Sequence, residues 1–124
     1  MSKKIAGVVI AVLMGATPAL AQNAVCVEPV VPAGVDGATA TREQIVASIA
    51  AAKDFMAKSD TYQQCLADDL EAKKQAAAKA GTTFDEQLHQ VAMAKVAANQ
   101  QAKDKLAADT NAQAGIYKQH AAAK

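Results

Sequence analysis

The chain has 124 residues, a length that limits it to one small domain. Its formal net charge is +1. Its 13 basic and 12 acidic residues are interspersed, which argues against a nucleic-acid-binding protein, because such proteins concentrate Lys and Arg on one face. Alanine is abundant, whereas there are two Phe, two Tyr and no Trp. Since alanine favours helix but buries little area, this composition predicts long, thin helices rather than a thick globular core.

The N-terminus has the three parts of a secretory signal peptide. Lys3 and Lys4 supply the positive end, and an uncharged apolar run follows at residues 5–14. This run is too short to cross a bilayer, whose apolar layer is about 30 Å thick. An A-x-A sequence ends at Ala21, so residues 1–21 are predicted to be cleaved as a signal peptide; an uncleaved membrane anchor is the alternative. We therefore expect a periplasmic or secreted bacterial protein without stable membrane insertion.

Residues 22–40 are predicted to form an extended arm. Pro29 and Pro32 block helix and favour polyproline-like backbone. The valines of this segment make it more apolar than a free linker, so we expect it to pack on its own protein, with an interaction motif as the alternative. The pair Asp36 and Gly37 then indicates a turn.

The first predicted helix spans about residues 42–80. Thr41 and Gln44 have the spacing of a capping box, and Gly81 is placed to end the helix. Apolar residues follow a 4-3-4-3 spacing that is typical of coiled coils. A polar stretch around Ser59 interrupts the spacing and leaves a kink or break there as an alternative.

The second predicted helix spans about residues 84–120. Thr83 and Glu86 have the spacing of another capping box, which predicts a connection of two or three residues. Such a short connection makes the two helices antiparallel. The predicted fold class is therefore all-α: an antiparallel helical hairpin of two long alanine-rich helices at residues 41–124, with an extended N-terminal arm.

Two cysteines connect these parts, Cys26 in the arm and Cys65 in the first helix. Two cysteines in an exported protein usually form a disulfide. The chain from the arm cysteine to Thr41 can span about 50 Å, whereas the helix from Thr41 to Cys65 covers about 36 Å. A disulfide is therefore predicted, structural rather than redox-active because C-x-x-C spacing is absent. In that arrangement the arm's valines are expected to cover apolar residues of the helix: Val30, Val31 and Val35 over Ile49 and Met56.

The order of these features resembles a known group of proteins. A signal peptide is followed by two motifs: C-x-x-P-x-x-P-x-G (Cys26, Pro29, Pro32, Gly34) and Y-x-x-C-L (Tyr62, Cys65, Leu66). This combination resembles small, uncharacterised exported helical proteins of alphaproteobacteria over about residues 26–70. The resemblance implies an exported protein and brings no assigned activity. The Ala/Lys/Gln-rich helical body is also similar to periplasmic coiled-coil proteins such as envelope chaperones.

The sequence does not indicate an enzyme. His89 and His120 are the only histidines, and no serine, cysteine or acidic residue stands in a catalytic motif with either. Asp68 and Asp69 are adjacent on a predicted helix, so their side chains point about 100° apart and do not form a carboxylate pair. We therefore expect neither catalysis nor a cofactor.

A metal site is also not predicted. His89 and Met93 are four residues apart and could present an imidazole and a thioether to copper from one helix face. A solvated histidine and a packing methionine are the simpler interpretation. A copper carrier is therefore a remote alternative.

Two apolar stripes are candidates for partner binding: Phe55 and Tyr62 on the first helix, and Phe84, Leu88 and Val91 on the second. Covering by the arm or by self-association is the alternative interpretation. The stripes favour a protein partner or self-association, and hence a periplasmic interaction or structural protein of the cell envelope. A holdase-type chaperone for unfolded exported proteins is the main alternative function.

Overall fold

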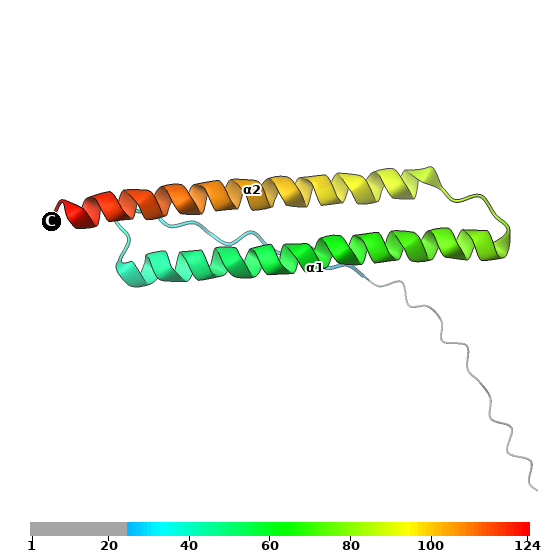
Figure 1. The fold of residues 1–124 in the computed structure, drawn as a ribbon, viewed down its shortest axis with the longest axis horizontal. Coiled ribbons are helices and arrows are strands. Elements are labelled where there is room, and N and C mark those ends of the chain that lie inside the picture. The colour runs from blue at the N-terminus through cyan, green and yellow to red at the C-terminus, as the bar shows by residue number, and fades with distance from the viewer. Residues whose placement is uncertain (1–24) are drawn as a thin grey trace, which may run out of the picture.

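The computed structural model describes residues 25–124; residues 1–24, which contain the predicted signal peptide at 1–21, lie outside this description. The described chain forms two α-helices and no strand: α1, Arg42–Ala80, and α2, Glu86–Ala122. The helices pack side by side and antiparallel, and the arm runs along them (Figure 1). The predicted all-α hairpin is confirmed.

The first turn of α1 contains the predicted capping box. The Gln44 N–H donates to Thr41 Oγ1 at 3.2 Å, and the Thr41 N–H donates to Gln44 Oε1 at 2.8 Å. The helix continues through Ser59 without interruption, so the kink or break left open there does not occur. The Thr61 hydroxyl donates to the Ala57 carbonyl at 3.2 Å and the Ser59 hydroxyl accepts from α2, which satisfies both groups inside the helix.

A left-handed cap ends α1. Gly81 has a φ of 68°, and the N–H of Thr82 donates to the Ala77 carbonyl at 3.0 Å. Glycine adopts this conformation without the steric cost that a Cβ imposes. The chain then needs residues 81–85 to reverse, which is longer than the connection expected from the sequence.

The N-cap of α2 is Asp85 rather than Thr83. The Asp85 carboxylate Oδ1 accepts from the Gln87 N–H at 2.9 Å. The predicted capping box of Thr83 and Glu86 is therefore wrong. Aspartate caps at least as well as threonine, and the later start leaves Thr83 in the reversal of the chain.

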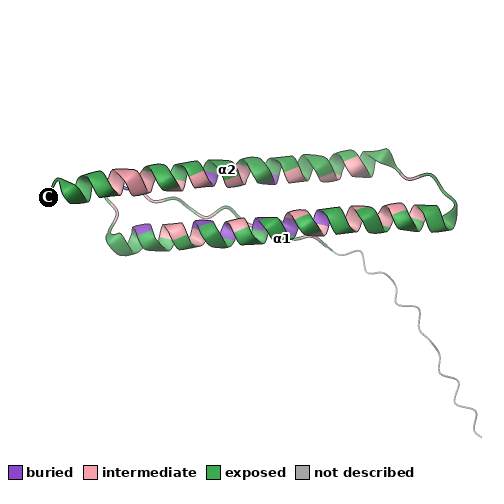
Figure 2. Ribbon diagram, in the orientation of Figure 1, coloured by how far each residue is buried: buried purple, intermediate pink, exposed green. Residues whose placement is uncertain are grey.

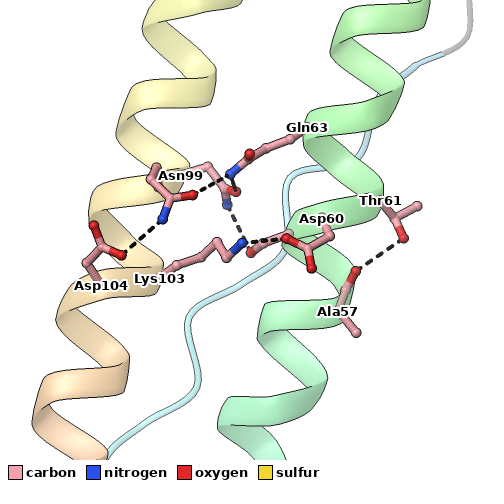
Figure 3. Close-up of polar contacts among 9 residues, drawn as sticks. Ala57, Asp60, Thr61, Gln63, Asn99, Lys103 and Asp104 are labelled. Atoms are coloured by element: carbon pink, nitrogen blue, oxygen red, sulfur yellow. Dashed lines mark hydrogen bonds and ion pairs between the residues drawn. The ribbon is translucent and has the colours of Figure 1, made fainter.

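The arm runs along one side of the helix pair and returns to α1 through a turn (Figures 1 and 3). Figure 1 shows it running from the middle of α1 toward the N-terminal end of that helix. Asp36 forms the turn: its carbonyl accepts from the Ala40 N–H at 2.8 Å, and its Oδ1 accepts from the Ala38 N–H at 2.9 Å. The turn is thus where the sequence predicts it.

Burial is concentrated in the half of the hairpin beside the arm (Figure 2). Buried residues of α1 end at Leu66, and those of α2 begin at Asn99. We call residues 25–66 and 99–122 the closed half, and residues 67–98 the open half. The apolar centre of the closed half is a cluster of Ala52, Phe55 and Leu106, against which Met56 and Ala102 pack.

Candidate functional site

A disulfide joins the N-terminal end of the arm to the middle of α1. The Cα atoms of Cys26 and Cys65 are 5.6 Å apart, and the bond closes a loop between residues 39 positions apart. The predicted pairing is confirmed. Because Cys65 directly precedes Leu66, the last buried residue of α1, the bond marks the border between the closed and open halves.

The arm contacts the hairpin with every third residue. Cys26, Pro29, Pro32 and Val35 are half-buried, whereas the two residues between each neighbouring pair are exposed. A polyproline II helix has three residues per turn, so one side chain in three faces the same side. The burial pattern therefore indicates that the arm docks with a polyproline II-like twist.

Two valines of the arm are not where the sequence analysis places them. Val30 is 89% exposed and Val31 is 49% exposed, and of the three valines expected to cover α1 only Val35 is half-buried. The prediction that these valines cover α1 is based on their hydrophobicity. The three-residue period instead turns Pro29 and Pro32 toward the helices and Val30 away from them.

Tyr62 lies beneath the start of the arm. Its side chain is 4% exposed, and this burial raises its pKa, with a further upward contribution from the negative charge of Glu28 on the arm. Next to Tyr62 is a mostly apolar hollow of about 480 Å³, bounded by Val27 and Pro29 of the arm and by Lys58 among others on α1. The ionisation of Tyr62 is therefore sensitive to whether the arm is docked.

A layer of polar side chains crosses the interface between α1 and α2 (Figure 3). Asn99 Nδ2 donates to Ser59 Oγ at 3.1 Å, and Asn99 Oδ1 accepts from Gln63 Nε2 at 2.8 Å. Ser59 and Asn99 are 0% and 2% exposed. Beside them Lys103 forms an ion pair with Asp60 across the interface. Because these buried groups satisfy one another only in this alignment, the layer favours one register of the two helices.

The open half contains no buried residue, although it carries large apolar side chains. Leu88, Val91 and Met93 of α2 are 40%, 54% and 47% exposed. An alanine-rich pair of helices buries little area by itself, so these three side chains of α2 remain accessible.

Two hollows open between the helices and reach across the border of this half, since Leu66 of the closed half lines both of them. One of about 510 Å³ is lined by Leu70, Met93 and Val96 among others, and one of about 80 Å³ by Leu88 and Val91 among others. Val91 and Met93 are two residues apart and therefore about 200° apart around α2. The open half thus presents apolar surface on two different sides.

The structure separates the two stripes that the sequence analysis groups as partner-binding candidates. Phe55 and Tyr62 are 2% and 4% exposed in the closed half. Phe55 packs with Leu106 of α2, and Tyr62 lies under the arm. These two aromatic side chains are therefore core residues and not part of an exposed surface.

The second stripe lies in the open half. Leu88 and Val91 are exposed, whereas Phe84 is half-buried in the connection between the helices. The Lys74 ammonium lies 5.6 Å from the centre of the Phe84 ring, a cation–π contact that links α1 to the connection. Of the five candidates, Leu88 and Val91 are the exposed ones.

His89 and Met93 lie one turn apart on α2. His89 is half-buried, and its Nδ1 has no hydrogen-bond partner among the residues that the structure describes. Within residues 25–124, no group of three or more His, Cys, Asp or Glu side chains is placed to hold a metal ion. In the same part of the chain, no helix combines the length and apolarity that crossing a bilayer requires.

Sequence reasoning missed two contacts that position the elements. Asn99 is disfavoured in a helix interior and lies seven residues before Leu106, so it shares the buried face of α2. That spacing could have revealed it. The second contact joins the arm to α2: the Gly37 N–H donates to Gln113 Oε1 at 2.8 Å. No feature of the sequence indicates this pairing of residues far apart in the chain.

The comparisons with known proteins add no relative. No protein-family model matches this sequence, and no curated protein or solved structure matches it. Function is therefore argued from the chain's own geometry.

Proposed function

We propose that this protein is an exported, non-catalytic interaction protein of the bacterial cell envelope, and that the open half of its hairpin binds a protein partner. The observation that carries the proposal is the uneven burial of the two halves. The open half has no buried residue and exposes Leu88, Val91 and Met93, while the closed half is packed and crosslinked. A rigid base with an accessible apolar extension suits recognition of a second protein.

Export is supported by two features of different kinds. The sequence of residues 1–21 has the organisation of a secretory signal peptide. The Cys26–Cys65 disulfide belongs to an oxidising compartment such as the periplasm. Fusion of residues 1–21 to a reporter enzyme that is active only after export tests this part, and retention of the reporter inside the cytoplasm contradicts it.

The binding surface is tested by photocrosslinking in intact cells. A photoreactive residue is placed at Val91 or at Met93, both exposed in the open half. Gln90 is the matched control, because it is exposed and borders neither hollow of the open half. We expect one dominant protein, with a second copy of this chain among the admissible partners, to crosslink from Val91 or Met93 and much less from Gln90. Equal crosslinking from all three positions contradicts a defined surface.

A holdase-type chaperone is the second candidate function. The 47% exposure of Met93 favours it, since flexible methionine side chains adapt to many different apolar sequences. This function predicts many unrelated exported proteins in the same crosslinking experiment, and suppression of aggregation of an unfolded client protein in vitro. A partner-specific protein crosslinks one species and does not suppress aggregation.

A further inference from the structure

The arm is attached firmly at its two ends and weakly between them. At one end is the Cys26–Cys65 disulfide, and at the other the Gly37 N–H donates to Gln113 Oε1 at 2.8 Å. The hydrogen bonds of the described residues include none made by residues 27–35. This middle segment contacts the helices with one residue in three.

The middle segment leaves most of its side chains exposed. Val27 and Val30 are 77% and 89% exposed, so these two valines contribute little to docking. Ordering an extended segment costs conformational entropy at every residue, and that cost must be offset by contacts or by a covalent link. Here Pro29, Pro32 and Val35 supply the contacts, and the disulfide supplies the link.

The hairpin itself does not need the arm to stay paired. The cluster of Ala52, Phe55 and Leu106 joins α1 to α2 directly. The hydrogen bond from Asn99 to Ser59 does the same without any arm residue. Loss of the arm therefore uncovers one side of this interface without removing its internal contacts.

We propose that the arm is a redox-controlled strap: the Cys26–Cys65 disulfide, which is not a redox catalyst, holds residues 27–35 over the closed half, and its reduction by an external dithiol releases them. Gly37 keeps the released segment attached at its other end. When the strap is released, the side of the hairpin that contains Tyr62 becomes exposed. This device goes beyond the proposed binding by the open half and does not depend on it.

The chemical step is thiol–disulfide exchange with a dithiol reductant. One thiolate of the reductant attacks a sulfur of the Cys26–Cys65 bond, and the other cysteine leaves as a thiolate that takes up a proton. The second thiol of the reductant then displaces the remaining cysteine. Two electrons pass to the protein, which gains two thiols, and the reductant becomes a disulfide. Both cysteines are half-buried, and Cys65 lines the hollow beside the arm.

Tyr62 reports the state of the strap. Its pKa is raised first by burial and then by Glu28 on the arm; release of the arm removes the Glu28 charge and the share of the burial that the arm provides. We therefore titrate the phenol by its ultraviolet absorbance in a Tyr117→Phe background, in which Tyr62 is the only tyrosine. The oxidised protein is expected to titrate above the ordinary tyrosine value of about 10, and the protein treated with a dithiol is expected to titrate closer to it.

Three variants distinguish release of the arm from other causes of a change in the pKa of Tyr62. Glu28→Gln in the oxidised protein removes the charge alone and is expected to give the smaller part of the downward shift. Cys26→Ser is expected to reproduce the full shift without reductant. Cys65→Ser is expected to behave as Cys26→Ser, because either change removes the same bond.

A second measurement tests motion directly at neutral pH. Backbone ¹⁵N relaxation is expected to show residues 27–35 as rigid in the oxidised protein and mobile after reduction, with α1 and α2 unchanged. The proposal is overturned if these residues stay rigid and the raised pKa of Tyr62 persists after reduction. It is also overturned if reduction unfolds the helices, because the strap requires a hairpin that outlasts its release.

Discussion

Asn99 and Ser59 are the most deeply buried side chains of the described chain, and both are polar. Their hydrogen bond, together with that from Gln63 to Asn99, satisfies these groups at the centre of a sparse core. A shift of one helix along the other would leave the Asn99 amide without partners. The pair therefore contributes more to the choice of one alignment than to the free energy of unfolding.

Removing Asn99 alone should lower the free energy of unfolding more than replacing Ser59 and Asn99 together. Asn99→Ala leaves the donor of Gln63 without its best acceptor and opens a small void, and we expect a loss of about 1–3 kcal/mol in the free energy of unfolding. The double variant Ser59→Ala/Asn99→Leu should recover part of this loss. Urea denaturation measures both. Gln100→Ala is the exposed control, and an equal loss for it would contradict a special role of Asn99.

Gly37 is the arm residue for which side-chain volume matters most. A Cβ at this position would lie 2.0 Å from the Gln113 carbonyl oxygen, so Gly37→Ala must push the arm away from α2. We expect a loss of about 1–3 kcal/mol in thermal or urea unfolding. Gly34→Ala is the matched control in the same arm, because a Cβ there meets no atom within 4 Å. Equal effects of the two substitutions would rule out the close contact.

The raised pKa of Tyr62 makes stability depend on pH in the alkaline range. The folded state holds the phenolic proton more tightly than the unfolded state, whose pKa is about 10. The resulting contribution is fully present below pH 10 and is lost as the pH rises through the folded-state value. We expect Tyr62→Phe to lose less stability than the wild type as the pH rises above about 10, measured by urea denaturation. Parallel curves for the two proteins would contradict this.

Helices α1 and α2 are each set by local signals at their ends. Thr41 is the N-cap and Gly81 the C-cap of α1, and Asp85 is the N-cap of α2. Between these signals the alanine-rich sequence propagates helix with little help from packing, including through the open half where no residue is buried. Element boundaries in this protein therefore respond to cap residues more than to core residues.

Two glycine substitutions should have opposite effects on these elements. Gly81 has a φ of 68°, so Gly81→Ala introduces steric strain, and we expect a loss of about 1 kcal/mol. Gly115 lies within α2, and a Cβ added there would meet no atom within 4 Å, so Gly115→Ala should gain about 0.5–1 kcal/mol through helix propensity. Thermal unfolding followed by circular dichroism measures both signs. Changes of the same sign would refute the assignment of the two conformations.

Residues 25–124 form one half that contains buried residues and one half that contains none, with the disulfide at the border. The closed half contains the apolar cluster, the polar layer and the arm. The open half extends from it as two helices, of which α2 exposes Leu88, Val91 and Met93. A partner that binds the open half would supply the burial that this part of the chain does not provide for itself.

The disulfide should supply a large share of the stability of this small fold. Its loop spans 39 positions, for which the chain-entropy estimate is about 4 kcal/mol. We expect the double variant Cys26→Ser/Cys65→Ser to unfold at a lower urea concentration while keeping most of its helicity at low urea. Reduced wild-type protein serves as the comparison without sequence change. An unchanged midpoint would show that the loop closure contributes nothing.

Residue types and their spacing are enough to predict the all-α hairpin, the capping box at Thr41, the end of α1 at Gly81 and the pairing of Cys26 with Cys65. Each of these depends on residue types close in the chain, or on there being two cysteines to pair. The sequence also identified Leu88 and Val91 as an apolar stripe, and the structure leaves both exposed.

The docking of the arm and the two helices determines which apolar side chains are covered. Phe55 and Tyr62 have the same amphipathic spacing as an exposed stripe, and packing against α2 and the arm buries them. The arm's contacts follow the three-residue period of its backbone rather than its hydrophobicity, so Pro29 faces the helices and Val30 faces outward. The contact of Gly37 with Gln113 joins residues 76 positions apart. Local sequence preference does not encode such contacts, because they depend on how the elements dock.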